Sequence, residues 1–397
     1  MIAALTRRLL TETQPRLLWK FLYDFGWKGM RAVQKFEKRL QQGQFFPAFL
    51  FLSVTNNCNL SCQGCWCTPS SPPKQLSLDT MDNIVTSCKL QGSHFFGILG
   101  GEPLLHPDVL ELFRRHPDAY FLLFTNGLLL TDSIARELNR LGNVSPLISV
   151  EGLGPVSDER RGGRSVYERT LSGVEACRKH KLITGVATSL CQSNVADLAT
   201  ERFLREMIAR GVHYAWYYLY RPVGPRPTPE LALTAEQVLA VRRFIVDIRA
   251  RLPIAVVDAY WDAQGGALCP AVVGMAHHIS PSGDIEPCPP LQFARDNVGD
   301  GRNLEQVFAD SEFLSRFRRE ISKTTQGCII LENPALLKRF LEESGASDSS
   351  GRGTAFDELA RMDVRPSHHL PGEEIPEKHW AYRLAKKFWF FGFGAYG

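Results

Sequence analysis

Three cysteines lie close together in the run Cys58-Asn-Leu-Ser-Cys62-Gln-Gly-Cys65, and their spacing points to metal chemistry. Thiolate is the soft ligand that iron–sulfur clusters use. Three thiolates on one short loop can hold three irons of a [4Fe–4S] cube and leave the fourth iron open to a small molecule. A tetrahedral zinc site, with Cys67 as its fourth ligand, is the alternative that these residues leave open.

A glycine-rich turn, Gly100-Gly101-Glu102-Pro103, follows the next strand-like run of the chain. Two adjacent glycines allow a backbone to approach a ligand closely. Taken alone, the turn is equally compatible with a plain strand-to-helix connection. Its place after a buried strand, at the edge where parallel sheets bind ligands, favours a role in binding.

Polar and charged residues also follow the third, fourth and fifth strand-like runs. The candidates for ligand contact are Asn126, Ser149, Glu151, Arg160, Arg161 and Asn194. An arginine in this set can pair with a carboxylate bidentately, and a solvated surface position is an equal alternative. A further set ends the sixth run: Tyr217, Tyr218, Tyr220 and Arg221. These side chains either line a substrate pocket or pack the sheet.

Cys269, Cys288 and Cys328 form a second, more widely spaced group. Prolines flank Cys288 on both sides, and because proline fixes φ this loop is expected to be rigid. A metal cluster, a zinc site completed by a histidine, and a domain without metal are all compatible with this spacing. Cys88 and Cys177 instead fall in helical patterns and are predicted to be packed core thiols.

Strand-like and helix-like stretches alternate through residues 48–262, and these elements must position the candidate residues. The predicted strands are Ala48–Val54, His94–Leu99, Tyr120–Thr125, Leu147–Val150, Thr184–Leu190 and Tyr214–Tyr220. They are rich in β-branched and aromatic residues, as strands buried on both faces are. Ser77, Thr131 and Thr234 are predicted helix caps. Six such units predict the α/β class, with a parallel sheet curved into an open, partial (β/α)6 TIM-like barrel.

The rest of the chain divides by composition. The predicted regions are an amphipathic, basic, helical N-terminal extension at 1–47, the barrel at 48–262, a small cysteine-containing auxiliary domain at 263–345, a flexible linker at 346–379, and a basic aromatic tail at 380–397. The linker is predicted because Ser, Gly, Asp, Glu and Pro replace apolar periodicity there.

Charge is distributed unevenly along the chain. Residues 1–45 carry nine Lys and Arg against three acids, whereas the net charge of the whole chain is only +4, which argues against a nucleic-acid partner. The basic N-terminus and the aromatic tail either contact a lipid headgroup boundary or pack on the barrel, and packing is favoured. Ten cysteines without a visible secretory signal favour a reducing cytoplasm. No uninterrupted apolar run approaches the ~20 residues that cross a bilayer.

The Cys-x3-Cys-x2-Cys loop after the first strand resembles the signature of the radical S-adenosylmethionine (SAM) superfamily, and Gly100–Pro103 resembles its GGEP motif. The resemblance implies that SAM binds the open iron, and that its reductive cleavage yields a 5′-deoxyadenosyl radical for hydrogen abstraction. It assigns Gly100–Pro103 to the methionine amino group and Arg160 or Arg161 to the carboxylate. The remaining candidates are Asn126, Ser149, Glu151 and Asn194. The family often has an aromatic residue where this chain has Gly64, with Trp66 following the third cysteine.

The second cysteine group resembles the SPASM/twitch extension of the same superfamily. This resemblance implies a shortened module with one auxiliary [4Fe–4S] cluster bound by Cys269, Cys288 and Cys328. Its fourth ligand is left open among water, substrate, His277, His278 and Cys191. An external electron donor such as ferredoxin or flavodoxin is also implied.

The substrate is not identified by the sequence. A small molecule or a peptide is expected, with peptide modification, alcohol oxidation or a lipid-linked substrate as the options. An iron–sulfur electron carrier without SAM chemistry, or a zinc-binding structural protein, are the competing interpretations.

Overall fold

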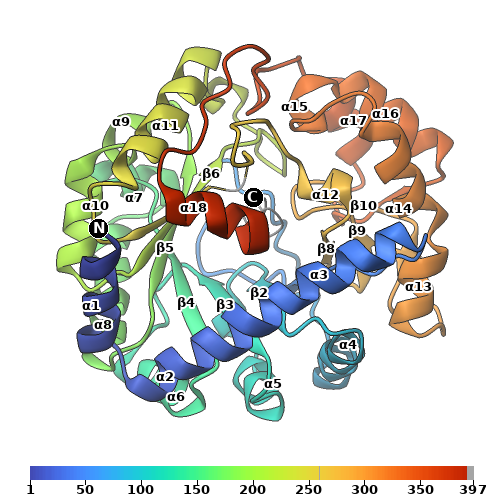
Figure 1. Ribbon diagram of the computed structural model, residues 1–397. Coiled ribbons are helices and arrows are strands. Elements are labelled where there is room, and N and C mark those ends of the chain that lie inside the picture. Colours follow the sequence, from blue (N-terminus) through green and yellow to red (C-terminus); the bar gives the residue numbers. More distant parts are fainter. Residues whose placement is uncertain (259, 391–397) are drawn as a thin grey trace.

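The structure, a computed structural model, describes residues 1–258 and 260–390 and centres on one ten-stranded sheet (Figure 1). The strands run in the order β11-β9-β8-β1-β2-β3-β4-β5-β6-β7. Its parallel strands are β1 (Phe49–Ser53), β2 (Phe95–Leu99), β3 (Tyr120–Thr125), β4 (Val144–Ser149), β5 (Gly185–Leu190), β6 (Tyr214–Leu219), β7 (Ala255–Asp258) and β8 (Ala276–Ile279). β7 and β8 do not pair within the described part of the chain, so the barrel stays open.

The six predicted strands are confirmed, and two further strands extend the parallel sheet. β1 is buried at every position, which explains its unbroken apolar sequence. β8 was missed because its sequence contains His277 and His278, which read as polar although both are buried. β8 pairs in parallel with β1, with Leu50 opposite His277. The auxiliary region therefore continues the barrel sheet.

Helices cover the outer face of the parallel strands. They are α4 (Leu78–Leu90), α5 (Val109–Arg115), α6 (Asp132–Leu141), α7 (Pro155–Arg161), α8 (Val166–Lys179), α9 (Val195–Leu198), α10 (Glu201–Ala209) and α11 (Ala235–Ile248), with short 3-10 turns η2 (Pro103–Leu105) and η3 (Pro229–Leu231). The predicted caps are confirmed: the side chains of Ser77, Thr131 and Thr234 each accept a backbone N–H of the first turn. Cys88 and Cys177 are fully buried helical thiols, as predicted.

The N-terminal extension is helical and lies across the amino ends of the strands. It consists of α1 (Ile2–Glu12), α2 (Pro15–Lys20), the π-helical segment η1 (Phe21–Trp27) and α3 (Lys28–Gln41). Phe21 packs edge-on against Tyr120 at the start of β3, and Phe25 contacts Phe95 at the start of β2. Figure 1 shows α2 and α3 as one long rod crossing the front of the molecule.

Several basic residues of this extension bind backbone carbonyls of the barrel, most of them in loops that follow its helices. Arg8 donates to the carbonyls of Pro253 (2.8 Å) and Ile208 (3.2 Å). Lys20 and Lys28 donate to the Pro117 and Asp118 carbonyls, each at 2.6 Å. Part of the basic excess of residues 1–45 therefore stabilises the barrel itself.

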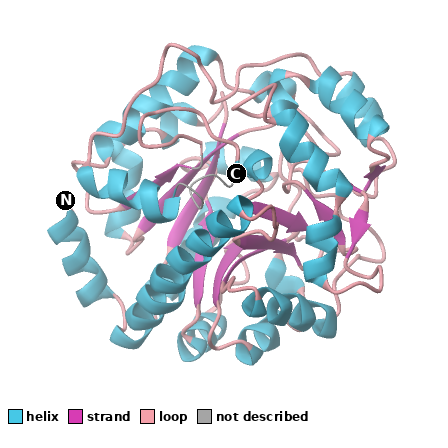
Figure 2. Cartoon of the chain, turned by 45° about the vertical axis from the view of Figure 1, so that its right-hand side comes forward, coloured by secondary structure: helices cyan, strands magenta, loops and turns pink. Residues whose placement is uncertain are grey.

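The auxiliary region continues the sheet with two antiparallel strands and adds a layer of short helices. These elements are α12 (Pro270–Val273), β9 (Asp284–Glu286), β10 (Phe293–Ala294), β11 (Asp296–Asn297), α13 (Leu304–Asp310), α14 (Glu312–Arg316), the π-helical η4 (Phe317–Ile321), α15 (Ile329–Glu332) and α16 (Pro334–Glu343). Figure 2 shows these helices gathered beside the edge of the sheet that β8 and β9 form.

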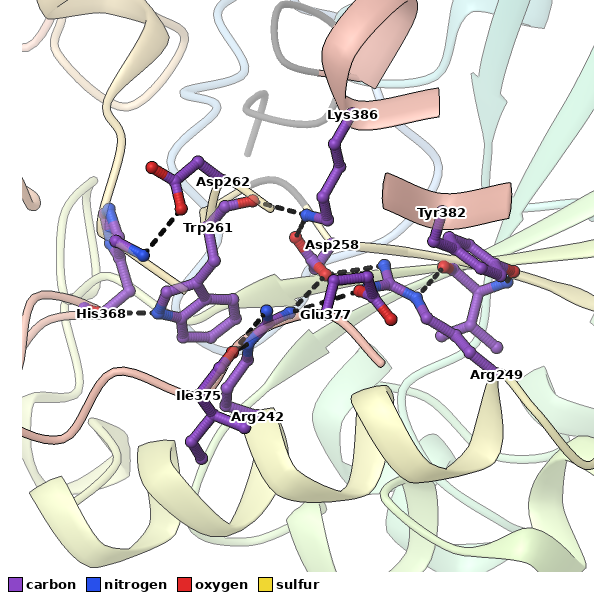
Figure 3. Close-up of polar contacts among 12 residues, drawn as sticks. Arg242, Arg249, Asp258, Trp261, Asp262, His368, Ile375, Glu377, Tyr382 and Lys386 are labelled. Carbon is purple, nitrogen blue, oxygen red and sulfur yellow. Dashed lines mark hydrogen bonds and ion pairs between the residues drawn. The ribbon is translucent and has the colours of Figure 1, made fainter. Parts of the chain in front are cut away.

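Residues 346–379 contain β12 (Ser347–Asp348), paired with β10, and α17 (Ala355–Ala360). Their flexibility stays a prediction, but both ends contact the fold. Ser349 donates to the Glu286 carboxylate at 2.5 Å. Near the other end, the Glu377 carboxylate is ion-paired with Arg249 inside a buried network (Figure 3).

The described part of the tail is α18 (Trp380–Ala385) followed by the π-helical η5 (Lys386–Phe390). The Lys386 ammonium donates to the Asp258 carboxylate at 2.8 Å, and Asp258 also accepts Arg249 at 2.6 Å (Figure 3). Phe391, Phe393 and Tyr396 of the predicted aromatic tail lie outside the described residues. Among the described helices, none combines the length and apolar character needed to cross a bilayer.

Candidate functional site

Cys58, Cys62 and Cys65 leave β1 at its carboxyl end and line one wall of a cavity together. All three are free thiols and only partly exposed. The loop is held by Arg160: its guanidinium donates to the Gln63 carbonyl at 2.6 Å, and its own carbonyl accepts the Gln63 N–H at 2.9 Å. The three sulfurs are therefore presented by a braced loop at the end where parallel barrels bind ligands.

The ring of Tyr220 leaves room only for glycine at position 64. Gly64 has φ +67°, and a Cβ built there would lie 2.2 Å from the Tyr220 hydroxyl oxygen. Tyr220 comes from the end of β6, and Arg160 stacks over its ring at 5.3 Å. An aromatic ring thus adjoins the cysteine loop although residue 64 itself carries no side chain.

Two more glycines allow the cysteine loop to pack closely against other segments. A Cβ at Gly162 would lie 2.3 Å from the Ser61 carbonyl oxygen, and one at Gly224 would lie 2.3 Å from the Cys65 carbonyl oxygen. Backbone atoms cannot move aside as a flexible side chain can. The positions of α7 and of the segment after β6 therefore set the shape of the loop.

The glycine turn after β2 packs on the segment that leads to Cys58. The Gly101 N–H donates to the Thr55 carbonyl at 2.8 Å, and a Cβ at Gly101 would lie 2.1 Å from the Asn57 carbonyl oxygen. Gly100 and Gly101 line the cavity. Their backbone is thus exposed to a ligand beside the cysteines.

Glu102 and Pro103 lie behind this wall and are absent from the cavity lining within the described chain. The buried Glu102 carboxylate accepts the Thr125 hydroxyl and the Asn126 N–H, both at 2.7 Å. Burial raises the pKa of Glu102, and these hydrogen bonds oppose that rise. Glu102 ties the turn after β2 to the turn after β3; a direct contact of Glu102 or Pro103 with SAM stays a prediction.

The remaining predicted residues come together around the same cavity, with one exception. Those that line it are Asn126, Ser149, Glu151, Arg160 and Arg161. Asn194 lies outside the described lining and supports Glu151 instead: its side-chain amide donates to the Glu151 backbone carbonyl at 3.2 Å and to the Ser189 carbonyl at 3.0 Å. The Glu151 carboxylate in turn accepts the Ser189 N–H at 3.1 Å.

The charges in the cavity are buried and incompletely paired. Burial raises the pKa of Glu151 although Arg160 and Arg161 oppose the rise. Burial would lower the pKa of the Arg161 guanidinium, but the proximity of Cys62 and Glu151 raises it above its ordinary value. Burial and the neighbouring Cys62 raise the pKa of Cys65 to about 12. These thiols need a cationic partner to ionise, and cluster iron would be one.

Four buried polar atoms of the cavity residues have no hydrogen-bond partner within the described chain. They are Arg160 Nε, Arg161 Nε, Thr188 Oγ1 and the Tyr218 hydroxyl. Buried polar groups are usually satisfied, so their concentration on one cavity favours a polar ligand there. Thr188 and Ser189 of β5 also line the cavity and were missed from the sequence, since nothing in an apolar strand distinguishes a cavity-facing hydroxyl.

The donor set fits a cluster better than a single zinc ion. Within the described residues, no group of three or more His, Cys, Asp and Glu side chains could hold one metal ion. Cys67 is buried and directs its thiol to the Asn56 carbonyl at 3.8 Å, away from the cavity lining. A [4Fe–4S] cluster binds each thiolate at a different iron, so its cysteines need not converge on one point.

Cys269, Cys288 and Cys328 line a second cavity although they are far apart in sequence. Cys269 precedes α12, Cys328 precedes α15, and Cys288 follows β9 between two prolines. Burial raises the pKa of Cys269 to about 11 and also raises that of Cys288. Arg221 donates from Nε to the Cys328 sulfur at 3.1 Å.

The structure distinguishes the candidate fourth ligands of this second group. His277 lines the second cavity and its buried Nε2 has no hydrogen-bond partner in the described chain. His278 is engaged on both ring nitrogens, by Ser53 at 2.7 Å and by Glu286 at 2.5 Å. Cys191 packs with Tyr220 and Leu231, away from the second cavity. Of the two histidines, only His277 thus keeps a ring nitrogen without a described partner, and its ring packs against Phe45 and Phe308.

The two cavities share a wall. Phe51, Arg221 and Pro289 line both of them. Of the residues at the end of β6, Tyr218, Tyr220 and Arg221 line the first cavity. Tyr217 faces the other side of the sheet, where its hydroxyl donates to the Leu198 carbonyl at 2.7 Å. Of the two alternatives left open by the sequence, lining a cavity fits the positions of Tyr218, Tyr220 and Arg221, and packing the sheet fits Tyr217.

Residues 52–204 match the family model of the Radical SAM superfamily. The chain is 31% identical over 173 residues to an AdoMet-dependent heme synthase of Methanosarcina barkeri, covering 42% of this chain and 50% of that one. It is 26% identical over 263 residues to a PqqA peptide cyclase of Streptomyces rochei, covering 61% of this chain and 69% of that one. The match thus spans half of the first relative and about two thirds of the second.

Among solved structures, SuiB of Streptococcus suis superposes with a TM-score of 0.62 at 16% identity, over 73% of this chain and 72% of SuiB. At that identity the likeness speaks for the fold, and it confirms the predicted partial barrel. The matched family segment contains the cysteine loop, the glycine turn and the polar cavity residues in the expected order. Residues 52–204 therefore form a Radical SAM superfamily domain, and the relatives and the fold of the chain support a radical SAM enzyme with a SPASM-like C-terminal extension.

Proposed function

We propose that this protein binds SAM at a [4Fe–4S] cluster held by Cys58, Cys62 and Cys65 and cleaves it reductively. The cluster, when bound, supplies the electron that breaks the S–C5′ bond and so yields a 5′-deoxyadenosyl radical for hydrogen abstraction. One observation carries the proposal: three thiols, two glycine backbones and unpaired guanidinium atoms lie on the walls of a single cavity.

The chain's own residues have distinct roles in this proposal. The exposed backbone of Gly100 and Gly101 receives the polar methionine end of SAM beside the cysteines. Arg161, whose Nε is buried without a partner, pairs with the carboxylate. Glu151, backed by Asn194, and Ser149 and Asn126 contact the nucleoside part. Arg160 is a positioning residue, since it holds the cysteine loop through Gln63.

A second cluster is proposed at Cys269, Cys288 and Cys328. Three thiols on one buried cavity, with the guanidinium of Arg221 bonded to one of them, support an anionic iron–sulfur group. His277 supplies the fourth ligand when no substrate or water does. This proposal keeps the boundaries 263–345 for the auxiliary domain.

The reductant and the substrate come from outside the chain. A small external electron donor such as ferredoxin or flavodoxin supplies the electron, and a reducing cytoplasm suits ten free cysteines. A peptide substrate is favoured over a small alcohol because relatives include a peptide cyclase and a SuiB structure bound to its precursor peptide. The first cavity, lined by Phe51, Phe124 and Tyr218, would take one side chain of such a peptide.

The first test is anaerobic reconstitution, followed by iron counting and measurement of 5′-deoxyadenosine from SAM under reduction. The wild-type protein should form 5′-deoxyadenosine, and the variant with Cys58, Cys62 and Cys65 all changed to Ala should form none. A variant with Cys88→Ala, a buried helical thiol far from both cavities, is the matched control and should keep the activity. Formation of 5′-deoxyadenosine by the triple variant would refute the proposal, and a carrier without SAM chemistry would form none in any variant.

A further inference from the structure

Large apolar side chains are exposed along one face of the long N-terminal helix. Trp19, Leu22, Tyr23 and Trp27 recur at helical spacing across α2 and η1, and Trp19 and Trp27 are 66% and 53% exposed. The rings of Trp19 and Tyr23 stack at 6.0 Å. Leu22 lies on the same exposed face. The buried face is formed by Leu17, Phe21 and Phe25, which pack on the barrel.

A second exposed stripe lies on the C-terminal helix. Trp380, Leu384 and Phe388 are exposed at four-residue intervals on α18 and η5. The opposite face of the same helix is anchored by the buried network of Figure 3: Lys386 binds Asp258, and the Tyr382 hydroxyl accepts the Val256 N–H at 2.9 Å. The stripe is therefore displayed by a helix that is fixed in place.

The two stripes lie on separate elements that α3 links. η5 contacts α3, which continues directly from η1, and α18 and α3 lie side by side in both Figure 1 and Figure 2. Of the eleven exposed large hydrophobic residues in the described chain, seven fall on these two stripes. Monomeric proteins scatter such residues singly, so their concentration here indicates a contact surface. We call these seven residues the aromatic face.

The charges beside the aromatic face are positive. Arg31, Arg383 and Lys387 are exposed and have no carboxylate partner within the described chain. Residues 378–390 contain no Asp or Glu, and on α2 and η1 the one acid, Asp24, is buried and bonded to Lys28 at 2.6 Å. Such a surface is complementary to an anionic partner with an apolar interior.

We propose that the aromatic face docks the protein on the surface of an anionic lipid bilayer. Trp and Tyr favour the headgroup level because their rings are apolar at one end and polar at the other. Exposed Lys and Arg beside them bind the negative leaflet, as on interfacial amphipathic helices. The part of the face on α2 and η1 lies at the amino ends of the strands, opposite the cysteine loop. Docking through this part of the face would place the amino ends of the strands toward the membrane.

The test is co-sedimentation of the full, reconstituted protein with vesicles of phosphatidylglycerol and phosphatidylcholine, compared with phosphatidylcholine alone. Wild-type protein should bind the anionic vesicles at least about tenfold more tightly, and less at high salt. Trp19→Ser with Trp380→Ser, and separately Arg383→Gln with Lys387→Gln, should each weaken this binding about tenfold or more. Leu90→Ser is the matched control, since Leu90 is 77% exposed on α4, away from the face.

Several outcomes would overturn the proposal. They are equal binding to both vesicle types, no binding to either, or a loss with Leu90→Ser as large as with the tryptophan variant. Sedimentation velocity without vesicles would reveal the alternative occupant, a second copy of this chain, as a dimer that the tryptophan variant dissociates. All substituted residues are exposed, and 5′-deoxyadenosine formation by each variant tests the proposed function separately.

Discussion

The two cysteine groups are built in opposite ways. Cys58, Cys62 and Cys65 lie on one loop of eight residues, and neighbouring glycines and Arg160 hold that loop from outside. Cys269, Cys288 and Cys328 come from three separate segments of the auxiliary region and meet only in the folded chain. Yet arginine lies beside both groups: Arg160 and Arg161 at the first and Arg221 at the second.

This difference in construction bears on what each cysteine group binds. The first cavity keeps unpaired polar atoms, as a site that receives an external ligand should. At the second group, Arg221 already bonds the Cys328 sulfur and stacks on Tyr260 at 5.4 Å. We therefore propose that the first group binds an exchangeable ligand and that the second group holds a permanent one.

Removing the three cysteines of the second group should distinguish the two sites most clearly. With Cys269, Cys288 and Cys328 all changed to Ser, iron per chain should fall by about half, from about eight to about four. Formation of 5′-deoxyadenosine without substrate should stay within a few-fold of wild type, because the first cavity is untouched. Iron analysis and product chromatography measure both. Unchanged iron content would exclude the auxiliary cluster and leave the first site standing.

Replacing Arg161 and Arg221 by glutamine, one at a time, should sharpen the comparison. Arg161→Gln should raise the SAM concentration for half-maximal cleavage by about tenfold or more, since a charge-assisted bond to the carboxylate is lost. Arg221→Gln should leave that concentration unchanged. It should instead lower the midpoint potential of the auxiliary cluster, because a cation near a thiolate ligand favours the reduced state. Redox titration followed by electron paramagnetic resonance measures this shift. If both variants changed SAM cleavage and the midpoint potential equally, the two arginines would not have separate roles.

The outside support of the first loop can be tested with a matched pair of glycines. Gly162 and Gly301 both have positive φ, +70° and +78°, but only at Gly162 would a Cβ meet backbone, the Ser61 carbonyl oxygen. Gly301→Ala should cost about 1 kcal/mol of stability, the usual cost of a side chain at such φ. Gly162→Ala should cost more and also lower the iron retained by the first site. Thermal melting and iron counting measure the two effects. If both glycine variants lost the same stability and iron, the contact between residue 162 and the Ser61 carbonyl would be unimportant.

A smaller effect is expected from Glu151→Gln, which should increase the stability of the unliganded protein but weaken SAM binding. Burial raises the pKa of Glu151 above its ordinary 4.5. Its carboxyl group therefore contributes stability that is present below pH 4.5 and is lost as the pH rises through the folded-state pKa. At neutral pH the neutral glutamine should raise the melting temperature of the unliganded protein by about 1–2 °C and weaken SAM binding several-fold. Calorimetry with and without SAM measures both; a lower melting temperature would mean that the arginines outweigh burial.

Much of the first site could be predicted because its residues follow strand ends in order. The strands from β1 to β6 are apolar enough to be recognised, and Gly100 and Gly101 follow β2 directly. Three features could not be predicted. β8 reads as polar because it contains His277 and His278, although both are buried. Gly64 depends on a tyrosine that is distant in sequence, and Leu22 faces outward on a helix that contains a π-helical segment.

The sequence by itself determined that the three thiols of the first cysteine loop lie together, since three thiols within eight residues must stay close in any fold. It also determined the barrel class, because buried parallel strands need continuous apolar runs. Only the tertiary structure decided that Gly101 faces the cavity while Glu102 turns behind it, and that Cys269, Cys288 and Cys328 meet beside Arg221. The physical reason is separation along the chain. Short spacing limits the distances between residues of one loop, whereas the direction of a side chain and the contact of residues distant in sequence depend on how whole helices and strands pack.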